Sequence, residues 1–390
     1  MTIELSYALI TPYTIQKSRT GGIIARLLSR TDLELIGVKI FAPTQEFANQ
    51  YAKLIEDIND ETSSQESLKH LGDYVRENFA PHDNRFHRVM MLLFKGENAT
   101  RKLSDVVGQM KPGIRTGETI RDTYSDYVLN RDGSVRYFEP AVIVAPTISD
   151  TELYKKEMLF IANFVDSTTN IIDVPLLTSE DDSSKRTLVI IKPDNWRYPS
   201  SRPGNIIDML SRTGLRIVGC KLYRMSLDEA LEFYGPVKNI LREKLSPKIG
   251  KQAKEILERD LKIKLSEQDT ESLSNTIGMR YADDQFSQIV EFMSGLRPEE
   301  VAKEHTSDPG KVRCMVLIYQ GENAVNKIRD VLGPTDPTKA PGGTIRRDFG
   351  TDVMVNTAHA SDSYENAKRE MGIIKVDNNN IGKIIKESYK

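Results

Sequence analysis

The sequence predicts an α+β fold that is built twice along the chain, each copy with an antiparallel sheet in the element order βαββαβ. Residues 22–41 read GIIARLLSRTDLELIGVKIF, and residues 204–223 read GNIIDMLSRTGLRIVGCKLY. Further on, GENAT at 96–100 is matched by GENAV at 321–325, and ETIRD at 118–122 is matched by GTIRR at 343–347. Because internal repeats indicate repeated structural units, we expect two domains of one fold.

The second copy has the clearer element pattern. The apolar run TLVIIK (187–192) predicts a buried strand, and Ser226 with Glu229 forms a capping-box pattern that predicts a helix through Tyr234. The other expected elements are helices at 204–212, 286–293, 322–332 and 363–371, and strands at 215–223, 312–319 and 353–355. This order is the ferredoxin-like arrangement, with helices packed mainly on one face of the sheet.

The domain boundaries follow from the repeat and from composition. We expect a first copy at 1–165, a linker at 166–186, a second copy at 187–376 and a tail at 377–390. The linker is rich in Ser, Thr and Asp and has no helical period. The early repeats lie 182 residues apart and the later ones 225, so the second copy carries about 43 extra residues, near 238–283.

The inserted residues 238–283 are charged, with apolar residues spaced as on one helix face. They predict an added helix or a helical hairpin. Two interpretations fit this pattern. The insert could decorate the surface of its own domain, which we favour, or serve as a lid or contact surface.

The composition excludes several classes of protein. The chain has 390 residues and a net charge of −2, so it has no bulk basic field for nucleic acid or an anionic membrane. Cys220 and Cys314 stand in no paired spacing, so we expect neither a zinc site nor a disulfide scaffold. The first residues lack a signal-peptide pattern, and no apolar run approaches the ~18 residues of a membrane span. We therefore expect a cytoplasmic protein.

One motif carries the chemistry. The stretch NTAHASDS (356–363) resembles the nucleoside diphosphate kinase signature N-x-x-H-G-S-D-S, and it departs only at Ala360. IIKPD (190–194) and GPTDPTKAPGGTIRRDF (333–349) resemble the opening strand and the arginine-bearing segment of that family. The resemblance covers most of the second copy outside the insert. It implies an enzyme that moves the terminal phosphoryl group from a nucleoside triphosphate to a nucleoside diphosphate, with Mg²⁺ carried by the nucleotide.

The resemblance assigns catalytic roles by position. His359 is expected to become phosphorylated, with Ser361 and Glu370 orienting its imidazole and Tyr234 near the transferred group. A neutral imidazole is a nucleophile, and its phosphorylated form has a reactive N–P bond, so one pocket can serve donor and acceptor in turn.

The resemblance also assigns a nucleotide-binding set. Lys192 and Asn356 are expected at the ribose hydroxyls, with Lys192 also near the phosphates, and Arg329, Thr335 and Arg346 at the phosphates. Arginine suits this task because its guanidinium presents fork-shaped donors to phosphate oxygens. We expect no metal ligands from the protein itself.

The first copy lacks most of these residues. It keeps Arg121 at the position that corresponds to Arg346, and Tyr51 is a near match for Tyr234. The replacements are Thr11 for Lys192, Ser104 for Arg329, Met110 for Thr335 and, by alignment of Glu157 with Glu370, Pro146 for His359. The preceding stretch VLNRDGSVRYF (128–138) predicts a β-hairpin that turns at Asp132-Gly133.

A copy that keeps its amphipathic elements but loses its pocket is expected to serve as a packing partner. The resemblance implies an intramolecular pseudo-dimer, and a trimer of chains could mimic the hexamers of the family. Two alternatives stay open: a nucleotide-binding regulatory or scaffold protein with low turnover, and a histidine-phosphorylated donor to other proteins.

Overall fold

The computed structural model describes residues 3–58, 63–111, 113, 115–148, 150–177 and 185–389. It divides the chain into two compact units, of which the first is Met1–Leu222 with Met315–Lys390 and the second is Tyr223–Cys314. The first unit holds most of both expected copies, and the second holds the insert with its flanking residues. None of the helices described is long and apolar enough to cross a lipid bilayer.

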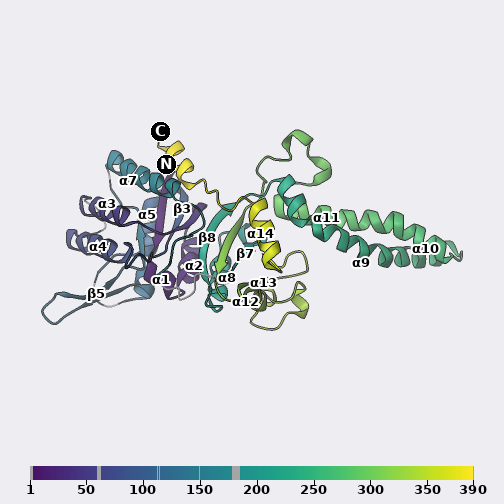
Figure 1. Ribbon diagram of the computed structural model, residues 1–390, viewed down its shortest axis with the longest axis horizontal. Helices are drawn as coiled ribbons and strands as arrows, with labels where there is room; N and C mark the ends of the chain where they lie inside the picture. Colours follow the sequence, from purple (N-terminus) through teal and green to yellow (C-terminus); the bar gives the residue numbers. More distant parts are fainter. Residues whose placement is uncertain are drawn as a thin grey trace. The chain divides into compact units, whose positions relative to one another are not determined.

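The described residues form two four-stranded sheets, and strands β3, β7 and β8 of these sheets are labelled in Figure 1. Both sheets have the same strand order. The first sheet runs β2-β3-β1-β6 and the second β8-β9-β7-β10. The strands of the first are β1 (Ile3–Ile10), β2 (Glu34–Phe41), β3 (Val89–Glu97) and β6 (Val142–Val144). Those of the second are β7 (Arg186–Ile191), β8 (Arg216–Tyr223), β9 (Cys314–Gln320) and β10 (Ala358–Ala360). The central strands β1 and β7 pair antiparallel with both neighbours, which confirms the ferredoxin-like prediction.

The helices repeat between the copies as well. In the first copy they are α1 (Pro12–Gln16), α2 (Thr20–Arg30), α3 (Gln45–Glu56), α4 (Gln65–Asn78), α5 (Ala99–Val107), α6 (Ile120–Tyr124) and α7 (Thr151–Ser167). In the second copy they include α8 (Arg202–Ser211), α12 (Ala324–Leu332), α13 (Ile345–Phe349) and α14 (Tyr364–Ile373). The expected hairpin forms from β4 (Asp126–Leu129) and β5 (Val135–Glu139), with Gly133 at a φ of 86° in its turn.

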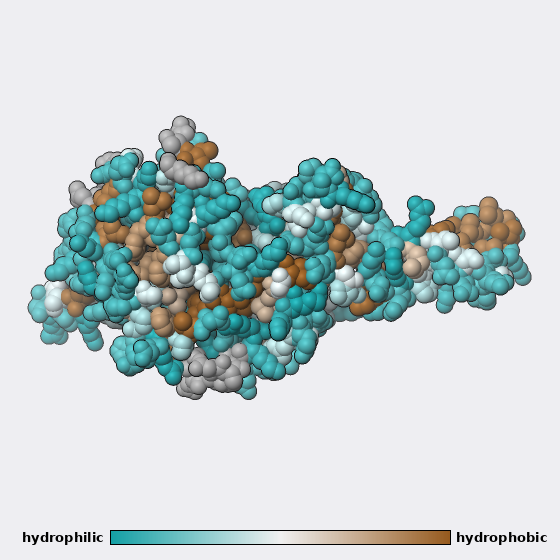
Figure 2. Space-filling model, turned by 45° about the horizontal axis from the view of Figure 1, so that its top comes forward, coloured by the Kyte–Doolittle hydropathy of each residue, from teal (hydrophilic) through white to brown (hydrophobic). Residues whose placement is uncertain are grey.

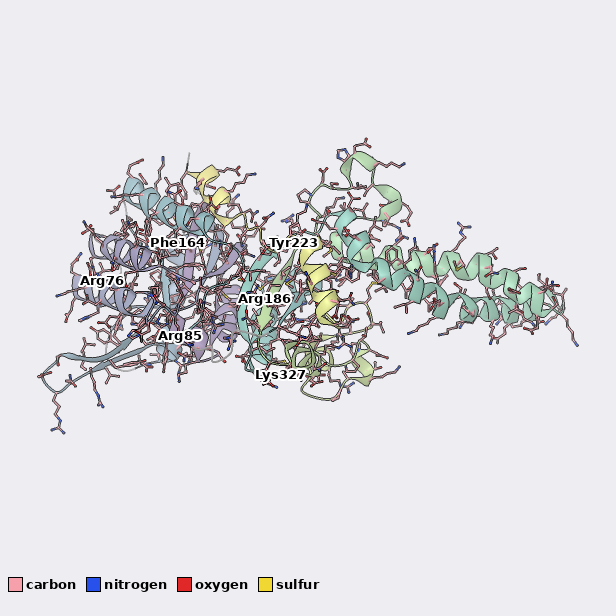
Figure 3. All side chains as sticks on the ribbon, in the orientation of Figure 1. Arg76, Arg85, Phe164, Arg186, Tyr223 and Lys327 are labelled. Carbon is pink, nitrogen blue, oxygen red and sulfur yellow. The ribbon has the colours of Figure 1, made fainter. Side chains whose placement is uncertain are left out.

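The core of the first copy is rich in aromatic rings. Phe47 on α3 lies with its ring centroid 4.2 Å from that of Phe164 on α7, and 5.5 Å from that of Tyr51. Phe164 is labelled among the side chains in Figure 3. The contact between Phe47 and Phe164 joins α3 to α7, while the contact between Phe47 and Tyr51 lies within α3.

The C-terminal tail is a helix that completes this core. Residues expected to lie outside both copies form α15 (Ile381–Ser388), whose Ile381 and Ile385 are fully buried in the hydrophobic cluster of the first copy. Lys386 on α15 also forms an ion pair of 2.7 Å with Asp166 at the end of α7. The domain that begins at the N-terminus therefore depends on residues from the far end of the sequence.

We expect Ile385→Ala to lower the free energy of unfolding by about 2–5 kcal/mol, because it removes a fully buried side chain and leaves a cavity. Denaturant unfolding followed by tryptophan fluorescence measures it. The control is Lys383→Ala in the same helix, whose side chain is exposed, with an expected effect within about 0.5 kcal/mol. Equal stability of the two variants would contradict a structural role for α15.

The expected linker is only partly free of structure. α7 continues to Ser167, and Ile172 N–H then donates to Val218 O of β8 at 2.8 Å. The buried Asn170 donates to Val376 O at 2.8 Å and accepts from Asn379 at 2.9 Å. The segment that leads from the first copy to the second is thus hydrogen-bonded, through Asn170, to the segment that leads from the second copy to α15. Residues 178–184 of the predicted linker lie outside the described part of the chain.

The two copies pack through helices α2 and α8, which cross at a pair of glycines. A Cβ atom on Gly204 would lie 2.3 Å from Gly21 O and 2.3 Å from Ala25 N. A Cβ on Gly21 would lie 2.4 Å from Gly204 O. Only glycine lets two backbones approach this closely, so both positions require it.

The second unit is a helical hairpin, as the insert predicts. α9 (Leu227–Leu261) is followed by α10 (Glu267–Leu273), a π-helical turn at Ser274–Gly278 and α11 (Met279–Ser294). Ser226 and Glu229 form the predicted capping box. The prediction that this helix ends near Tyr234 is wrong, because α9 continues through Pro236 and Pro247.

The arms of the hairpin are joined by a bidentate ion pair between Arg242 and Asp283, at 2.7 and 2.9 Å. Apolar side chains gather near the end of the hairpin (Figure 2), where Ile256, Leu261 and Ile263 are exposed.

Candidate active site

His359 lies in the middle of the three-residue edge strand β10, opposite Ile190 of β7. The prediction of a strand at 353–355 is wrong, since the strand forms at the histidine itself. Thr357, two residues earlier, has a φ of 75°, which is strained for a β-branched residue. Its carbonyl accepts the N–H of Lys192 at 2.9 Å. A left-handed turn thus feeds the histidine into the sheet beside the end of β7.

A carboxylate fixes the imidazole. The Nε2 atom of His359 lies 3.0 and 3.1 Å from the two carboxylate oxygens of Glu370 on α14. Ser361 donates its hydroxyl to the same carboxylate at 2.6 Å. Because an ionised carboxylate only accepts, Nε2 carries the proton, and the lone pair of the neutral ring is on Nδ1. The family signature has glycine where this chain has Ala360. Because Ala360 does not have a positive φ, alanine at this position leaves the strand intact.

A buried lysine and asparagine form a second pair. Lys192, at the end of β7, donates to Asn356 Oδ1 at 2.6 Å. The amide of Asn356 in turn donates to Val353 O at 2.8 Å and Thr335 O at 3.1 Å. Burial, followed by the positive charge of Arg346, lowers the pKa of Lys192 to about 8. The pair connects the end of β7 with the loop that contains Thr335.

Arg346 on α13 supports the backbone of the site. Its Nη1 donates to Gly333 O at 2.8 Å, and its Nη2 to Ala358 O at 3.0 Å. Burial, followed by the charge of Arg329, lowers the pKa of Arg346 to about 10. Arg329 on α12 is exposed and close enough to act electrostatically on Arg346. Thr335 has an exposed side chain and contributes its carbonyl to Asn356.

Tyr234 belongs to the second unit. It is buried on α9, with its ring centroid 4.9 Å from that of Phe233. The other eight predicted residues all lie in the first unit. Within that unit the structure connects His359, Ser361 and Glu370 into one group, and Lys192, Asn356 and Thr335 into another.

Two residues at this site are not part of the sequence prediction. Asn195, in the 3-10 turn Pro193–Trp196, is buried and donates to Lys192 O at 3.1 Å and to Thr357 O at 2.8 Å. Asp352 accepts the backbone N–H groups of Met354 and Val355, each at 2.8 Å. The only signals in the sequence are an asparagine next to KPD and an aspartate before an apolar run, and both patterns are common in loops.

The first copy has the same turn, but no histidine follows it at the position equivalent to His359. Thr11 N–H donates to Ala141 O at 3.1 Å, as Lys192 does to Thr357, and Ala141 has a φ of 62°. In the sheet Ile143 lies opposite Leu9, as His359 lies opposite Ile190. The buried Ile143 therefore stands at the histidine position, and the placement of Pro146 there is wrong by three residues.

The retained arginine is structural in both copies. Arg121 donates to Gly108 O and, at 2.9 Å, to Val142 O. These carbonyls occupy the positions that Gly333 and Ala358 have around Arg346. Survival of Arg121 is therefore explained by the backbone it supports and does not indicate a phosphate site.

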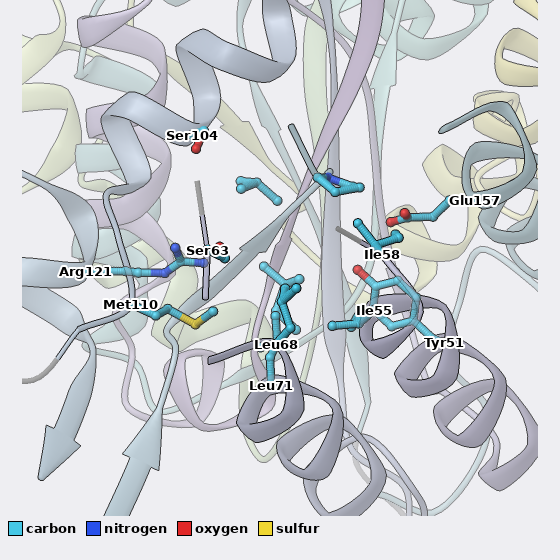
Figure 4. A pocket seen from close by; sticks show the side chains of 13 residues that line it. Tyr51, Ile55, Ile58, Ser63, Leu68, Leu71, Ser104, Met110, Arg121 and Glu157 are labelled. Carbon is cyan, nitrogen blue, oxygen red and sulfur yellow. The ribbon is translucent and has the colours of Figure 1, made fainter. Parts of the chain in front are cut away.

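In the first copy, side chains pack against one another where the second copy has the site around His359. Tyr7 donates to Glu157 and lies 2.9 Å from the hydroxyl of Tyr51, with all three side chains buried. The cavity between α3, α4 and Arg121 has a volume of about 30 Å³ (Figure 4), which is room for one or two waters. The enclosed space that the described side chains leave here is therefore water-sized.

In the second copy, a histidine with a fixed tautomer beside a buried lysine and two arginines has the chemistry of a phosphoryl-transfer site. The comparisons with known proteins agree. A family model described as nucleoside diphosphate kinase matches residues 248–379. The nucleoside diphosphate kinase of Anaeromyxobacter dehalogenans (strain 2CP-C) is 32% identical over 187 residues, covering 48% of this chain and 86% of that protein.

Two further relatives extend the match. The nucleoside diphosphate kinase of Campylobacter hominis is 32% identical over 187 residues, covering 48% of this chain and 92% of its own length. The nucleoside diphosphate kinase of Staphylothermus marinus is 30% identical over 192 residues, covering 49% of this chain and 93% of its own length. The crystal structure of an NDP kinase from Pyrobaculum aerophilum aligns with 49% of this chain and 94% of its own, at 26% identity and a TM-score of 0.33. This chain belongs to the nucleoside diphosphate kinase family.

Proposed function

We propose that this chain is a nucleoside diphosphate kinase that carries the phosphoryl group on Nδ1 of His359. The observation that carries the proposal is the bond from His359 Nε2 to Glu370, which itself accepts the hydroxyl of Ser361. It leaves Nδ1 as the nucleophilic atom and places a negative charge where the ring becomes cationic during attack.

The reaction proceeds in two half-reactions. Nδ1 attacks the terminal phosphorus of a nucleoside triphosphate in line, an N–P bond forms, and the bond from phosphorus to the bridging oxygen breaks. The nucleoside diphosphate leaves with that electron pair, while the proton on Nε2 stays with the ring and faces Glu370. A second nucleoside diphosphate then attacks the same phosphorus in reverse, which restores neutral His359.

Cationic and polar side chains hold the nucleotide in this scheme. Lys192 and Asn356 bind the ribose hydroxyls, while Arg329 and Arg346 bind the phosphates together with Thr335. A guanidinium has five N–H donors, and the two carbonyls around Arg346 take two of them, so it can orient the backbone and bind phosphate at once. Tyr234 is assigned a place near the transferred group on the resemblance alone.

Mg²⁺ fits this site as a companion of the nucleotide. No cluster of three or more His, Cys, Asp or Glu that could hold an ion occurs among the described residues. The side chains assigned to the phosphates are cationic, so the ion is expected on phosphate oxygens and water. When bound, Mg²⁺ neutralises part of the phosphate charge and so favours attack by the histidine.

The first copy acts as a structural partner of the second. Three observations support an intramolecular pseudo-dimer: the glycine crossing of α2 and α8, the bonded crossing segments and the α15 helix in the core of the first copy. The water-sized space between its packed side chains supports a non-catalytic role. We further propose that three such chains, each a pseudo-dimer, form the largest expected assembly.

Nucleotide binding should depend on pH through Lys192. Its pKa of about 8 means that the ammonium is present below pH 8 and is lost as the pH rises through this value. Because phosphate and ribose oxygens prefer the protonated form, the affinity for a nucleoside diphosphate should be full below about pH 7 and fall above about pH 8. Isothermal titration across this range measures it.

The matched variant is Lys192→Gln, which should bind more weakly and show no such step. A step of equal size in that variant would assign the pH dependence to another group.

Transfer of label tests the proposed function itself. The protein is incubated with ATP labelled at the terminal phosphate, and different nucleoside diphosphates are then added. A nucleoside diphosphate kinase passes the label to nucleoside diphosphates that carry different bases. A scaffold protein takes up no label, and a phosphohistidine donor passes the label to other proteins. Absence of label from both His359 and the added nucleoside diphosphates would contradict the proposed function.

A further inference from the structure

Asn195 is a buried asparagine directly behind the turn that leads into His359. It is 2% exposed, and its amide nitrogen donates to Thr357 O at 2.8 Å and to Lys192 O at 3.1 Å. Both partners are carbonyl oxygens, so the NH₂ group must face them, which fixes the orientation of the side chain. Asn195 thus bridges the end of β7 and the residue two positions before the histidine.

The bridged turn is strained. Thr357 is held in the left-handed region at a φ of 75°, which a β-branched residue adopts only when its surroundings enforce it. Its carbonyl accepts two donors, the backbone N–H of Lys192 at 2.9 Å and the Asn195 amide. A strained turn that lies this close to His359 changes the direction of the imidazole if it relaxes.

The first copy provides a control within the same chain. It has the same left-handed turn at Ala141 and the same backbone bond from Thr11. At the position of Asn195 it has Thr14, whose hydroxyl lies 2.9 Å from Thr11 Oγ1, and no described hydrogen bond joins it to Ala141. The turn therefore forms without the amide, and the additional bridge occurs in the copy that has the histidine.

We infer that Asn195 is a positioning residue for phosphoryl transfer, acting through Thr357 and Lys192 on the alignment of His359. This inference rests on the proposed function. In-line attack requires the reacting atoms at about 3–3.5 Å with aligned orbitals, and a misplacement of about 1 Å can cost about 10²-fold in rate. The side chain touches no reacting atom, so its effect belongs to the chemical step more than to nucleotide binding.

The test is the rate of His359 phosphorylation by labelled ATP, measured by rapid quench in Asn195→Ala and Asn195→Asp. Loss of the bridge should lower this rate about tenfold in Asn195→Ala, with KM within about threefold of wild type. Asn195→Asp has the same shape but sets a carboxylate against two carbonyls. It should lose about 10²-fold at neutral pH and regain rate as the pH falls, because the protonated acid can donate one bond to Thr357 O.

Two controls separate positioning from stability. Thermal unfolding of each variant measures the folded fraction, and Thr14→Ala removes the equivalent side chain of the first copy with an expected change in rate below about twofold. Wild-type phosphorylation rates in both Asn195 variants would overturn the inference. So would a lower rate explained fully by unfolding, or a raised KM with a normal rate of phosphorylation. An unlabelled wild-type protein would overturn the proposed function, and the inference with it.

Discussion

Replacement of His359 by glutamine is expected to abolish phosphoryl transfer, with a fall of at least ~10⁴-fold in turnover. The variant loses the atom that forms the covalent intermediate, while Lys192, Asn356 and the arginines stay in place. Nucleotide affinity should therefore change little. The measurement combines steady-state transfer from labelled ATP with equilibrium binding of a nucleoside diphosphate.

The labelled intermediate provides an independent check. A phosphoramidate is labile in acid and stable in alkali, so the label on wild-type protein should show both properties and should be absent from His359→Gln. The control is His305→Gln, because His305 is exposed and pairs only with Asp308 among the described contacts. Turnover of His359→Gln within tenfold of wild type would remove this residue from the mechanism.

Replacement of Gly204 by valine is expected to have a large effect on stability, a loss of about 3 kcal/mol or more in the free energy of unfolding. Any Cβ at this position meets backbone atoms of Gly21 and Ala25 at 2.3 Å, and backbone cannot rotate away as a side chain can. Helices α2 and α8 must then separate, which exposes apolar surface between the copies. Denaturant unfolding of the full chain measures the loss.

The matched control is Gly372→Ala on α14, where a Cβ meets no atom within 4 Å. Alanine should there be neutral or stabilise by up to about 1 kcal/mol, because it has the higher helix propensity. If Gly204→Val unfolded at the wild-type denaturant concentration, the close crossing of α2 and α8 would be refuted.

Elements with strong local signals were predictable from the sequence. Residues Leu188–Ile191 of β7 form an uninterrupted apolar run, the pattern expected of a strand that is buried in the centre of its sheet. The cap at Ser226 was predictable because its partner Glu229 lies at the fixed capping-box spacing. The group around His359 followed from a motif whose residues are close in sequence, apart from Glu370.

The end of α9 was not predictable, because tertiary packing overrides a local break. Gly235-Pro236 is a strong helix-ending signal, yet α9 runs to Leu261. The second arm of the hairpin packs against it so closely that a Cβ on Gly278 would lie 2.4 Å from Ser246 O. This contact joins residues far apart in sequence and leaves no local pattern.

The short strand was misplaced for a different reason. Residues 353–355 are apolar and two of them are β-branched valines, but Asp352 accepts the N–H groups of Met354 and Val355 and so forms a turn that competes with a strand. The strand forms instead at Ala358–Ala360, where β7 offers pairing partners. For strands of only three residues, β-propensity does not decide between two neighbouring segments such as 353–355 and Ala358–Ala360.

The helix α15 has a consequence for how the protein is made. Asp166 and Lys386, which pair across its contact with α7, are 220 residues apart. Domains generally fold in order as they leave the ribosome, at about 5–20 residues per second. The first copy cannot complete its core in this order, because Ile381 and Ile385 of that core follow the whole second copy in the sequence. The hydrophobic face that α15 covers therefore stays open until the second copy has been synthesised.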